Sequence, residues 1–285
     1  GPQARRGLRG GRIGHRPGMV LNAKRIEFSS FQEMAVHLDR WAEASLADPA
    51  AWSDALISSA HWLDYSARNQ VLLASYGADG PVAGSETWRL VPSSLEGRPC
   101  AVRAGEHGYP VRVPITTRGT EPDPYLGGHR PTRAAVDRWE WRPVFSVGQL
   151  ARRPGPDALL PGEVPAMLTG ADTPEQYLAA VRKVATATVR GRLPRSKDPD
   201  AILADAAGRL PRSAKRPELD PVLRRQVAWL VADRVNLAPG AIPSSDPGPL
   251  PARERWERLQ DVLEPALKLT AALGVVTGVD LCASP

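Results

Sequence analysis

The chain of 285 residues has only two cysteines and five histidines, and its apolar residues form no long uninterrupted run. Its two cysteines, Cys100 and Cys282, lie far apart in the sequence and are expected to be free thiols in a reducing cytoplasm. No Cys/His cluster has zinc-ligand spacing, so we expect no metal and no cofactor. No apolar run reaches the roughly 18–20 residues that span a bilayer, and no signal peptide is visible. These absences favour a cytoplasmic protein with no membrane partner.

Positive charge is unevenly distributed along the chain. Residues 1–25 contain seven basic residues and no acidic one, whereas the net charge of the whole chain is +6. The other 260 residues therefore sum to −1, and the basic character belongs mainly to this first segment. Residues 1–25 also lack apolar periodicity, which predicts a disordered basic tail. Two interpretations stay open for it: a leader without a role, or an arm that adds phosphate contacts.

Three helices are predicted at the start of residues 26–150. Ser29 or Ser30 can cap the first helix, which runs to about Ser45. The second spans roughly 49–63, and the third follows Ser66 as its cap and stops at Gly77. The apolar positions that recur at helical spacing in the first helix are Phe31, Met34, Leu38 and Trp41.

After Pro81 the pattern changes to short segments rich in Val, Trp and Thr, separated by Gly and Pro. Such segments are typical of the strands of a small antiparallel sheet. The predicted strands are 87–91, 99–103, 111–117 and 138–147. Residues 119–131 are expected to form a long loop.

The remainder of the chain is predicted to be helical. A Pro/Gly-rich connector over 151–173 leads into a helical domain over 174–285. Proline stands at or near the start of each of its helices, where the missing N–H costs nothing. The predicted helices are 174–190, 199–210, 221–236 and 251–273, the last with Pro265 as a point where it kinks or splits. Their amphipathic faces need a partner, which is either the core of the same chain or a surface for protein partners or self-association.

These elements predict an α+β fold in which N-terminal helices pack on a small antiparallel sheet, followed by a mostly α-helical domain. The expected organisation is a tail over 1–25, a mixed domain over 26–150, the connector and the helical domain.

Three motifs occur in order between residues 65 and 114: YSARN at the start of a helix, then VAGSETW, then VRAGEHGYPVRVP. Together with FSVGQ at 145–149, their order and spacing resemble the N-terminal domain of ArdC-type antirestriction proteins, which binds single-stranded DNA. The resemblance covers about residues 28–150. The matching positions are Tyr65, Ser66, Asn69, Leu72, Val82, Gly84, Thr87, Trp88, Val102, Arg103, Gly105, Glu106, Gly108 and Pro114.

The chain departs from this pattern in two places. Ala104 and His107 replace two lysines that the family has in the Gly-Glu turn, which removes two expected phosphate contacts. The His-Glu-x-x-His motif of the family's metallopeptidase-like domain is also absent. Without two histidines one helical turn apart there is no zinc cage and no activated water, so we expect no peptidase activity and no enzyme. Residues 174–285 are then either a degenerate relic of that domain or an unrelated helical module.

The candidate site residues follow from how proteins bind single strands, through aromatic stacking and phosphate contacts. The predicted nucleic-acid-binding residues are Tyr65, Asn69, Trp88, Arg98, Arg103, His107, Tyr109, Arg112 and Tyr125. Trp88 is either a stacking platform or a core residue. Asn69 either contacts a base edge or phosphate, or pins the neighbouring backbone.

The sequence therefore predicts a non-enzymatic single-stranded DNA-binding protein. It does not choose among protection, transfer, replication and repair of plasmid or other mobile-element DNA. The alternative is a protein-interaction or scaffold module whose DNA site has decayed, which the loss of both turn lysines favours.

Overall fold

The computed structural model of the chain describes most of residues 28–277. The described ranges are 28–59, 62–95, 97–117, 120–122, 129–131, 135–161, 173–189, 195–210, 218–234, 241–243 and 250–277. The predicted tail over 1–25 lies outside these ranges, as do Tyr125 and Cys282.

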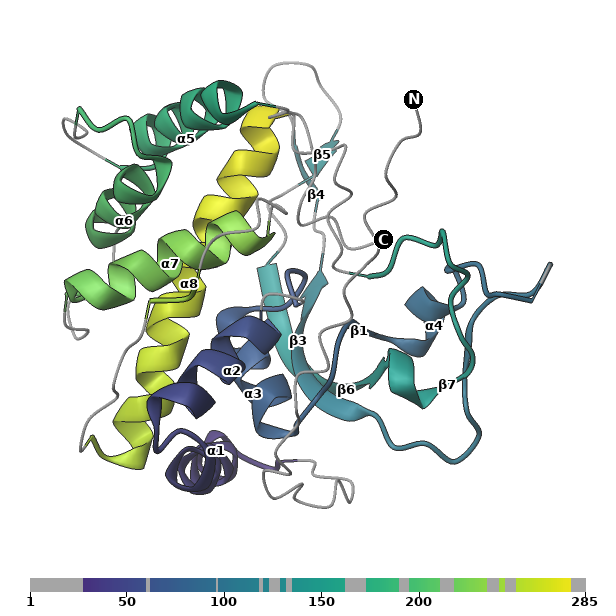
Figure 1. Ribbon diagram of the computed structural model, residues 1–285. Coiled ribbons are helices and arrows are strands. Elements are labelled where there is room, and N and C mark those ends of the chain that lie inside the picture. Colours follow the sequence, from purple (N-terminus) through teal and green to yellow (C-terminus); the bar gives the residue numbers. More distant parts are fainter. Residues whose placement is uncertain are drawn as a thin grey trace, which may run out of the picture.

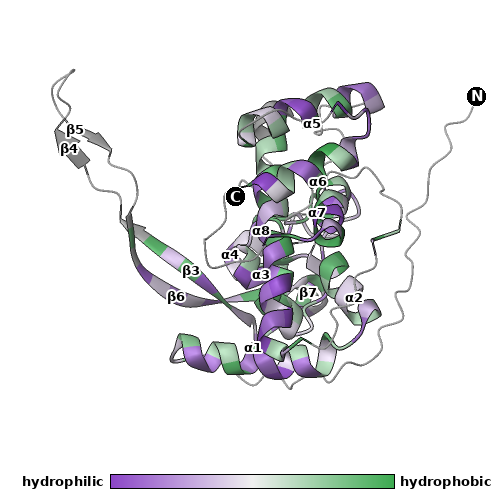
Figure 2. Cartoon of the chain, turned by 90° about the vertical axis from the view of Figure 1, so that its left-hand side faces the viewer, coloured by the Kyte–Doolittle hydropathy of each residue, from purple (hydrophilic) through white to green (hydrophobic). Residues whose placement is uncertain are grey.

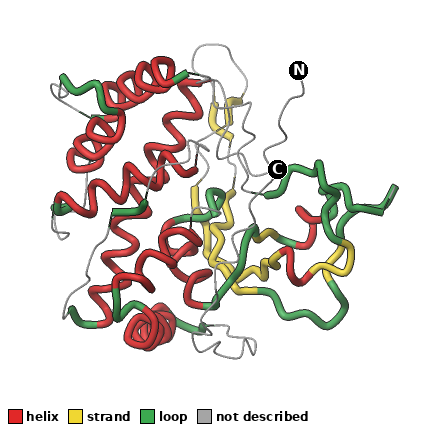
Figure 3. The backbone as a smooth tube through the Cα atoms, viewed as in Figure 1, coloured by secondary structure: helices red, strands yellow, loops and turns green. Residues whose placement is uncertain are grey.

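The fold is α+β, as predicted, with all the described helices except the short α4 on one side and the strands with their loops on the other (Figures 1 and 3). The helices are α1 (Phe31–Ser45), α2 (Pro49–Ser59), α3 (Ala67–Ser75), α4 (Ser85–Trp88), α5 (Pro174–Thr188), α6 (Pro199–Arg209), α7 (Pro221–Arg234) and α8 (Ala252–Thr277). The strands are β1 (Val82–Ala83), β2 (Ala101–Val102), β3 (Tyr109–Thr117), β4 (Thr120–Pro122), β5 (His129–Pro131), β6 (Ala135–Ser146) and β7 (Leu150–Arg152). A short 3-10 helix, η1 (Val147–Gln149), joins β6 to β7.

Local capping explains where the first helices begin and end. The Ser30 hydroxyl accepts the Glu33 N–H at the start of α1, and the Ser66 hydroxyl accepts the Asn69 N–H at the start of α3. A cap of this kind contributes about 1 kcal/mol. Beyond α3 the chain turns at Gly77, whose φ of 66° lies in the left-handed region that favours glycine. The predicted caps and the predicted stop are confirmed.

The C-terminal helices complete a core that α1–α3 begin. One continuous cluster of buried side chains runs from Phe28 to Leu273 and includes residues of both predicted domains. Arg253 of α8 holds the carboxylate of Asp39 in α1 through two hydrogen bonds of 2.7 and 2.6 Å, and the Trp256 Nε1–H donates to the same carboxylate at 2.8 Å. The apolar faces of α7 and α8 are thus buried inside the chain, and self-association through them would require these helices to leave the core.

Helix α8 continues through Pro265 rather than splitting there. An interior proline costs about 3 kcal/mol in a helix. Burial of each large apolar side chain contributes about 1.5–3 kcal/mol, so the packing of α8 against the other helices outweighs this cost. Its fully or almost fully buried apolar side chains are Trp256, Leu259, Val262, Leu263, Ala266, Leu269 and Leu273.

Strands β3 and β6 form a long antiparallel ribbon that projects from the helical body (Figure 2). The register pairs Tyr109 with Val144 at one end and Thr117 with Ala135 at the other, with an irregularity between Ile115 and Thr116. Strand β1 pairs with the other edge of β6 and completes a sheet of order β1-β6-β3. The antiparallel sheet is therefore confirmed, and β6 is longer than the predicted strand over 138–147.

One strand prediction and one loop prediction need correction. Residues 87–91 are not a strand, because the chain forms the single helical turn α4 and inserts Trp88 into a small core with Ala83, Val91, Cys100 and Leu150. The predicted loop over 119–131 contains the short pair β4–β5, in which Thr120 lies opposite Pro131. At α4, tertiary contacts of Trp88 override the local pattern. None of the described helices is long and apolar enough to cross a membrane.

Candidate nucleic-acid interface

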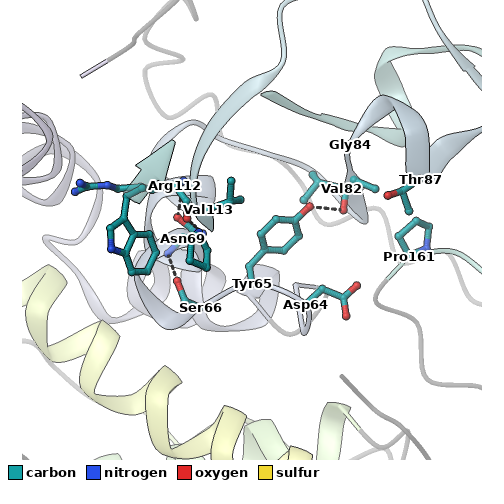
Figure 4. A pocket seen from close by; sticks show the side chains of 13 residues that line it. Asp64, Tyr65, Ser66, Asn69, Val82, Gly84, Thr87, Arg112, Val113 and Pro161 are labelled. Atoms are coloured by element: carbon teal, nitrogen blue, oxygen red, sulfur yellow. Dashed lines mark hydrogen bonds between the residues drawn. The ribbon is translucent and has the colours of Figure 1, made fainter. Parts of the chain in front are cut away.

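Three of the predicted site residues, Tyr65, Asn69 and Arg112, meet at one open pocket of about 400 Å³ (Figure 4). The pocket lies where the start of α3, the β1–α4 segment and the base of the β3–β6 ribbon come together. The lining residues are Asp64, Tyr65, Ser66, Asn69, Val82, Ala83, Gly84, Thr87, Arg112, Val113, Pro114, Trp139 and Pro161. Most positions that carry the sequence motifs at 65–87 therefore surround a single depression.

Asn69 holds the base of the ribbon in place. Its side-chain amide donates to the Arg112 carbonyl at 2.8 Å, and its amide oxygen accepts the Arg112 N–H at 3.0 Å. The amide thus takes the place of a neighbouring strand and satisfies two backbone groups at the edge of β3. With 5% of its surface exposed, Asn69 performs the backbone-pinning role, one of the two roles that the sequence left open.

Tyr65 forms the wall between the two ends of the pocket. Its hydroxyl donates to the Val82 carbonyl at 3.2 Å, which ties the start of α3 to β1. Burial, and secondarily the charge of Asp64, raises the pKa of the Tyr65 hydroxyl, so this residue is a neutral hydrogen-bond donor. Its polar end is already used, and only its ring faces the pocket.

Arg112 and Trp139 form the cationic and aromatic part of the pocket. The Arg112 guanidinium lies over the Trp139 indole, 5.7 Å from the ring centroid, and 51% of the Trp139 surface is exposed. Pro114 lies directly opposite Trp139 on the neighbouring strand. A cation over an open indole is an arrangement that binds both a base and its phosphate.

The sequence reasoning missed Trp139. The signal was the alternation Trp139-Glu140-Trp141, which places both indoles on one face of a strand. Trp141 is half-buried against Phe28, in the segment before α1, and its Nε1–H donates to the Phe28 carbonyl at 2.9 Å. The sequence could not tell which of the two indoles the segment around Phe28 covers.

Trp88 is corrected from a candidate stacking residue to a core residue. It has no exposed surface, and its Nε1–H donates to the Phe145 carbonyl at 2.8 Å. Its ring packs among Ala83, Val91 and Cys100, the last of which is a free cysteine. A ring without accessible surface cannot stack on a base.

Tyr109 is also less open than its place in the sequence suggested. It begins β3 instead of lying at a turn tip, and its ring stacks on Tyr76 at 6.2 Å between centroids. Burial raises the pKa of its hydroxyl. One face of this half-buried ring is therefore already covered. Tyr125 lies outside the described residues.

The Gly-Glu turn is held to η1 by its own side chains. Arg103 donates to the Glu106 carboxylate at 2.8 Å and to the Gly148 carbonyl at 2.9 Å. Gln149 donates to Glu106 at 3.2 Å and to the His107 carbonyl at 2.8 Å. The hydrogen bonds from Gln149 and then Arg103 lower the pKa of Glu106, which is therefore a carboxylate beside the Arg103 charge.

This turn requires glycine for a packing reason at one position. A Cβ on Gly108 would lie 2.8 Å from the Pro143 Cβ and 2.9 Å from the Val144 carbonyl oxygen. The start of β3 can therefore approach β6 only with glycine there.

The other predicted basic residues lie away from the pocket. Arg98 is exposed in the loop before β2, where its N–H donates to the Leu95 carbonyl. Arg98, Arg103 and His107 do not line the pocket that holds Arg112. Among the described residues, no three or more His, Cys, Asp or Glu side chains are grouped to hold a metal ion.

Comparison with known proteins adds little. No family model matches the chain, and no curated protein matches it. Among solved structures, the chain is similar to a metal-free crystal structure of the antirestriction protein ArdC from plasmid R388, at 13% identity and a TM-score of 0.35. That match covers 80% of this chain and 97% of the other. A superposition this loose carries no argument about either fold or function.

Proposed function

We propose that the chain is a non-enzymatic DNA-binding protein that holds single-stranded DNA across the face of the β3–β6 ribbon that carries Arg112 and Trp139. The observation that carries this proposal is the half-exposed indole with a guanidinium over its face at the mouth of a pocket. Stacking of a base on such a ring contributes about 1–3 kcal/mol. A duplex keeps its base faces stacked inside the helix, so this contact favours single strands.

The motifs support the same proposal from the sequence side. Residues of the YSARN and VAGSETW motifs surround the pocket, and Asn69 fixes the backbone from which Arg112 extends. The process served is the protection, transfer, replication or repair of plasmid or other mobile-element DNA.

The two faces of the ribbon differ in charge. On the face opposite Trp139, Glu140 accepts hydrogen bonds from Arg138 at 2.8 Å and from Arg142 at 2.9 Å. These arginines share one carboxylate, so each offers less net charge to a phosphate than its sequence position suggests. Arg112 is instead directed to an aromatic ring, which leaves its charge available for a phosphate.

The test compares labelled single-stranded oligothymidine of about 12 nucleotides with a duplex of the same length by fluorescence anisotropy. We expect tighter binding to the single strand and a loss of affinity between about 50 mM and about 200 mM salt. No binding to the single strand at the lower salt would refute the proposal and leave the protein-interaction module as the better hypothesis. Binding that disappears when residues 1–25 are removed would place the site on that segment instead.

Arg112→Ala identifies the face. It leaves the backbone hydrogen bonds to Asn69 intact and should weaken binding to every single strand, with a salt slope reduced by about one unit. Arg138→Ala, on the opposite face of the same ribbon, is the matched control and should have the smaller effect. A larger effect of Arg138→Ala than of Arg112→Ala would place the single-stranded DNA on the opposite face of the ribbon.

A further inference from the structure

Two half-exposed aromatic rings in the described part of the chain each have an arginine over them. One is Trp139, which is 51% exposed with the Arg112 guanidinium 5.7 Å from its ring centroid. The other is Phe31, the first residue of α1, which is 45% exposed with the Arg68 guanidinium 5.1 Å from its ring centroid. In both pairs about half of the aromatic residue stays open to solvent although the arginine is in place.

The arginines of the two pairs are linked through Asn69. Arg68 and Asn69 are neighbours in α3. The Asn69 amide donates to the Arg112 carbonyl at 2.8 Å and accepts the Arg112 N–H at 3.0 Å. The residue that lies over the Phe31 ring is therefore adjacent in the chain to the residue that holds Arg112.

The rings of the two pairs are linked through Phe28 and Trp141. The Phe28 carbonyl accepts the Trp141 Nε1–H at 2.9 Å, and the two rings lie 5.3 Å apart. Trp141 follows Trp139 by two residues on β6, so both indoles project from the same face of the strand. Phe31 follows Phe28 by three residues. The start of α1 therefore lies beside the base of the ribbon (Figure 2).

The exposure of Phe31 differs from that of its neighbours in α1. Met34 and Leu38 share its helical spacing, and both have no exposed surface. The prediction that all these apolar positions belong to the core is therefore wrong for Phe31. A single exposed apolar side chain needs no explanation by itself. Phe31 is distinctive because an arginine lies over its ring and two hydrogen-bonded links tie it to the region of Trp139.

We infer that Phe31 is a second stacking platform for the same single strand, which runs from Trp139 past Arg112 to the start of α1. This inference rests on the proposed function and extends its interface from the ribbon to the helical body. In the strand register Arg112 lies directly opposite Trp141, between the two platforms. A phosphate of the strand that joins the two stacked bases therefore passes the Arg112 guanidinium.

The test compares Phe31→Leu with the wild type in binding labelled oligothymidine of about 12 nucleotides by fluorescence anisotropy. Leucine keeps an apolar side chain but has no ring, so loss of one stacked base should weaken binding by about fivefold or more. Phe31→Tyr keeps a ring and should retain most of the affinity. Because Phe31 is half exposed, Phe31→Leu should unfold at nearly the same urea concentration as the wild type.

Val36→Ala is the matched control. Val36 is another exposed apolar residue of α1, at 37%, so this variant removes apolar surface from the same helix without removing a ring. Its affinity should equal that of the wild type. An equal loss in Val36→Ala and Phe31→Leu would overturn the inference, as would an unchanged affinity in Phe31→Leu.

Oligonucleotide length separates two platforms from one. Oligothymidine of about four nucleotides, measured by competition with the labelled strand, should lose less affinity in Phe31→Leu than the strand of about 12 nucleotides does. Trp139→Ala should weaken the binding of both lengths. Equal losses for both lengths in Phe31→Leu would overturn the inference. Each of these results still shows binding by the wild type, whereas a wild type that binds no oligothymidine refutes the proposed function itself.

Discussion

The small α4–β2–β7 region and the β3–β6 ribbon each contain a tryptophan, and the two regions use it differently. Trp88 has no exposed surface and donates its N–H to the Phe145 carbonyl, whereas Trp139 is half exposed with Arg112 over its ring. The two regions share β6 and its continuation, yet one uses its indole to form a core and the other presents its indole to solvent. An indole in a motif is therefore a binding residue only where the fold leaves its face open.

The largest effect should come from Trp88→Ala. Loss of a fully buried tryptophan typically costs about 3–5 kcal/mol of unfolding free energy, and here it also leaves the Phe145 carbonyl without its partner. Urea unfolding followed by circular dichroism measures this loss. Binding of single-stranded DNA per folded molecule should stay unchanged. A stable variant that has lost DNA binding would reverse the comparison.

Trp139→Ala should give the opposite result. A substitution at a half-exposed position usually changes the unfolding free energy by less than about 0.5 kcal/mol. Loss of one stacked base should weaken single-strand binding by about 1–3 kcal/mol, which is about five- to 150-fold. Anisotropy titration measures it, and Trp139→Phe should retain most of the affinity. Unchanged affinity in Trp139→Ala would remove the ribbon face from the proposed site.

Glu106→Gln tests whether the Gly-Glu turn also meets the strand. Glu106 neutralises part of the Arg103 charge, so its replacement should free Arg103 for a phosphate and tighten binding by a few-fold, about 1 kcal/mol or less. Measurement at low and high salt should show the gain mainly at low salt. If Glu106→Gln and the wild type bind with equal affinity at both salt concentrations, the interface does not include the Gly-Glu turn.

The smallest effect should be a pH dependence of the junction between ribbon and helices. The His37 ring lies 5.3 Å from both the Phe28 and the Tyr76 rings, and its Nε2 is 2.9 Å from the Ser75 hydroxyl oxygen. Burial, and secondarily the charge of Arg40, lowers the pKa of His37 below its ordinary value. The folded state therefore favours the neutral ring.

The sign of the effect follows from proton uptake. Below the unfolded pKa of about 6.5, the unfolded chain binds a proton at His37 that the folded chain does not, so stability falls as pH falls toward the lower folded pKa. Above about pH 6.5 this contribution is fully present. Urea unfolding on either side of that pH should show the slope in the wild type and a shallower one in His37→Gln. The same slope in both proteins would assign the effect to other groups.

Much of the fold could be predicted because it depends on local interactions. The caps at Ser30 and Ser66 and the turn at Gly77 lie where the sequence predicts them. The α4 turn could not be predicted in this way, because the pull of Trp88 into its core comes from residues far along the chain. The continuity of α8 through Pro265 likewise depends on packing against distant helices.

The candidate site was predicted in part. Tyr65 and Asn69 were predicted as site residues from their motif and Arg112 from its charge near the Gly-Glu turn, and all three line one pocket. Trp139 was missed, and Arg103 is held by Glu106 in a way that its position beside a turn did not reveal.

By itself, the sequence determined the fold class, the helix caps, the strand alternation and the residue types near the pocket, because period, capping and turn chemistry act over a few neighbours. Only the tertiary structure decided which indole is open. The carbonyl of Phe28, in the segment before α1, accepts a hydrogen bond from the Trp141 indole, and the Phe145 carbonyl accepts one from the Trp88 indole. The Trp139 indole lies instead beside Arg112. Burial is set by residues that are distant in the sequence, and no local pattern contains that information.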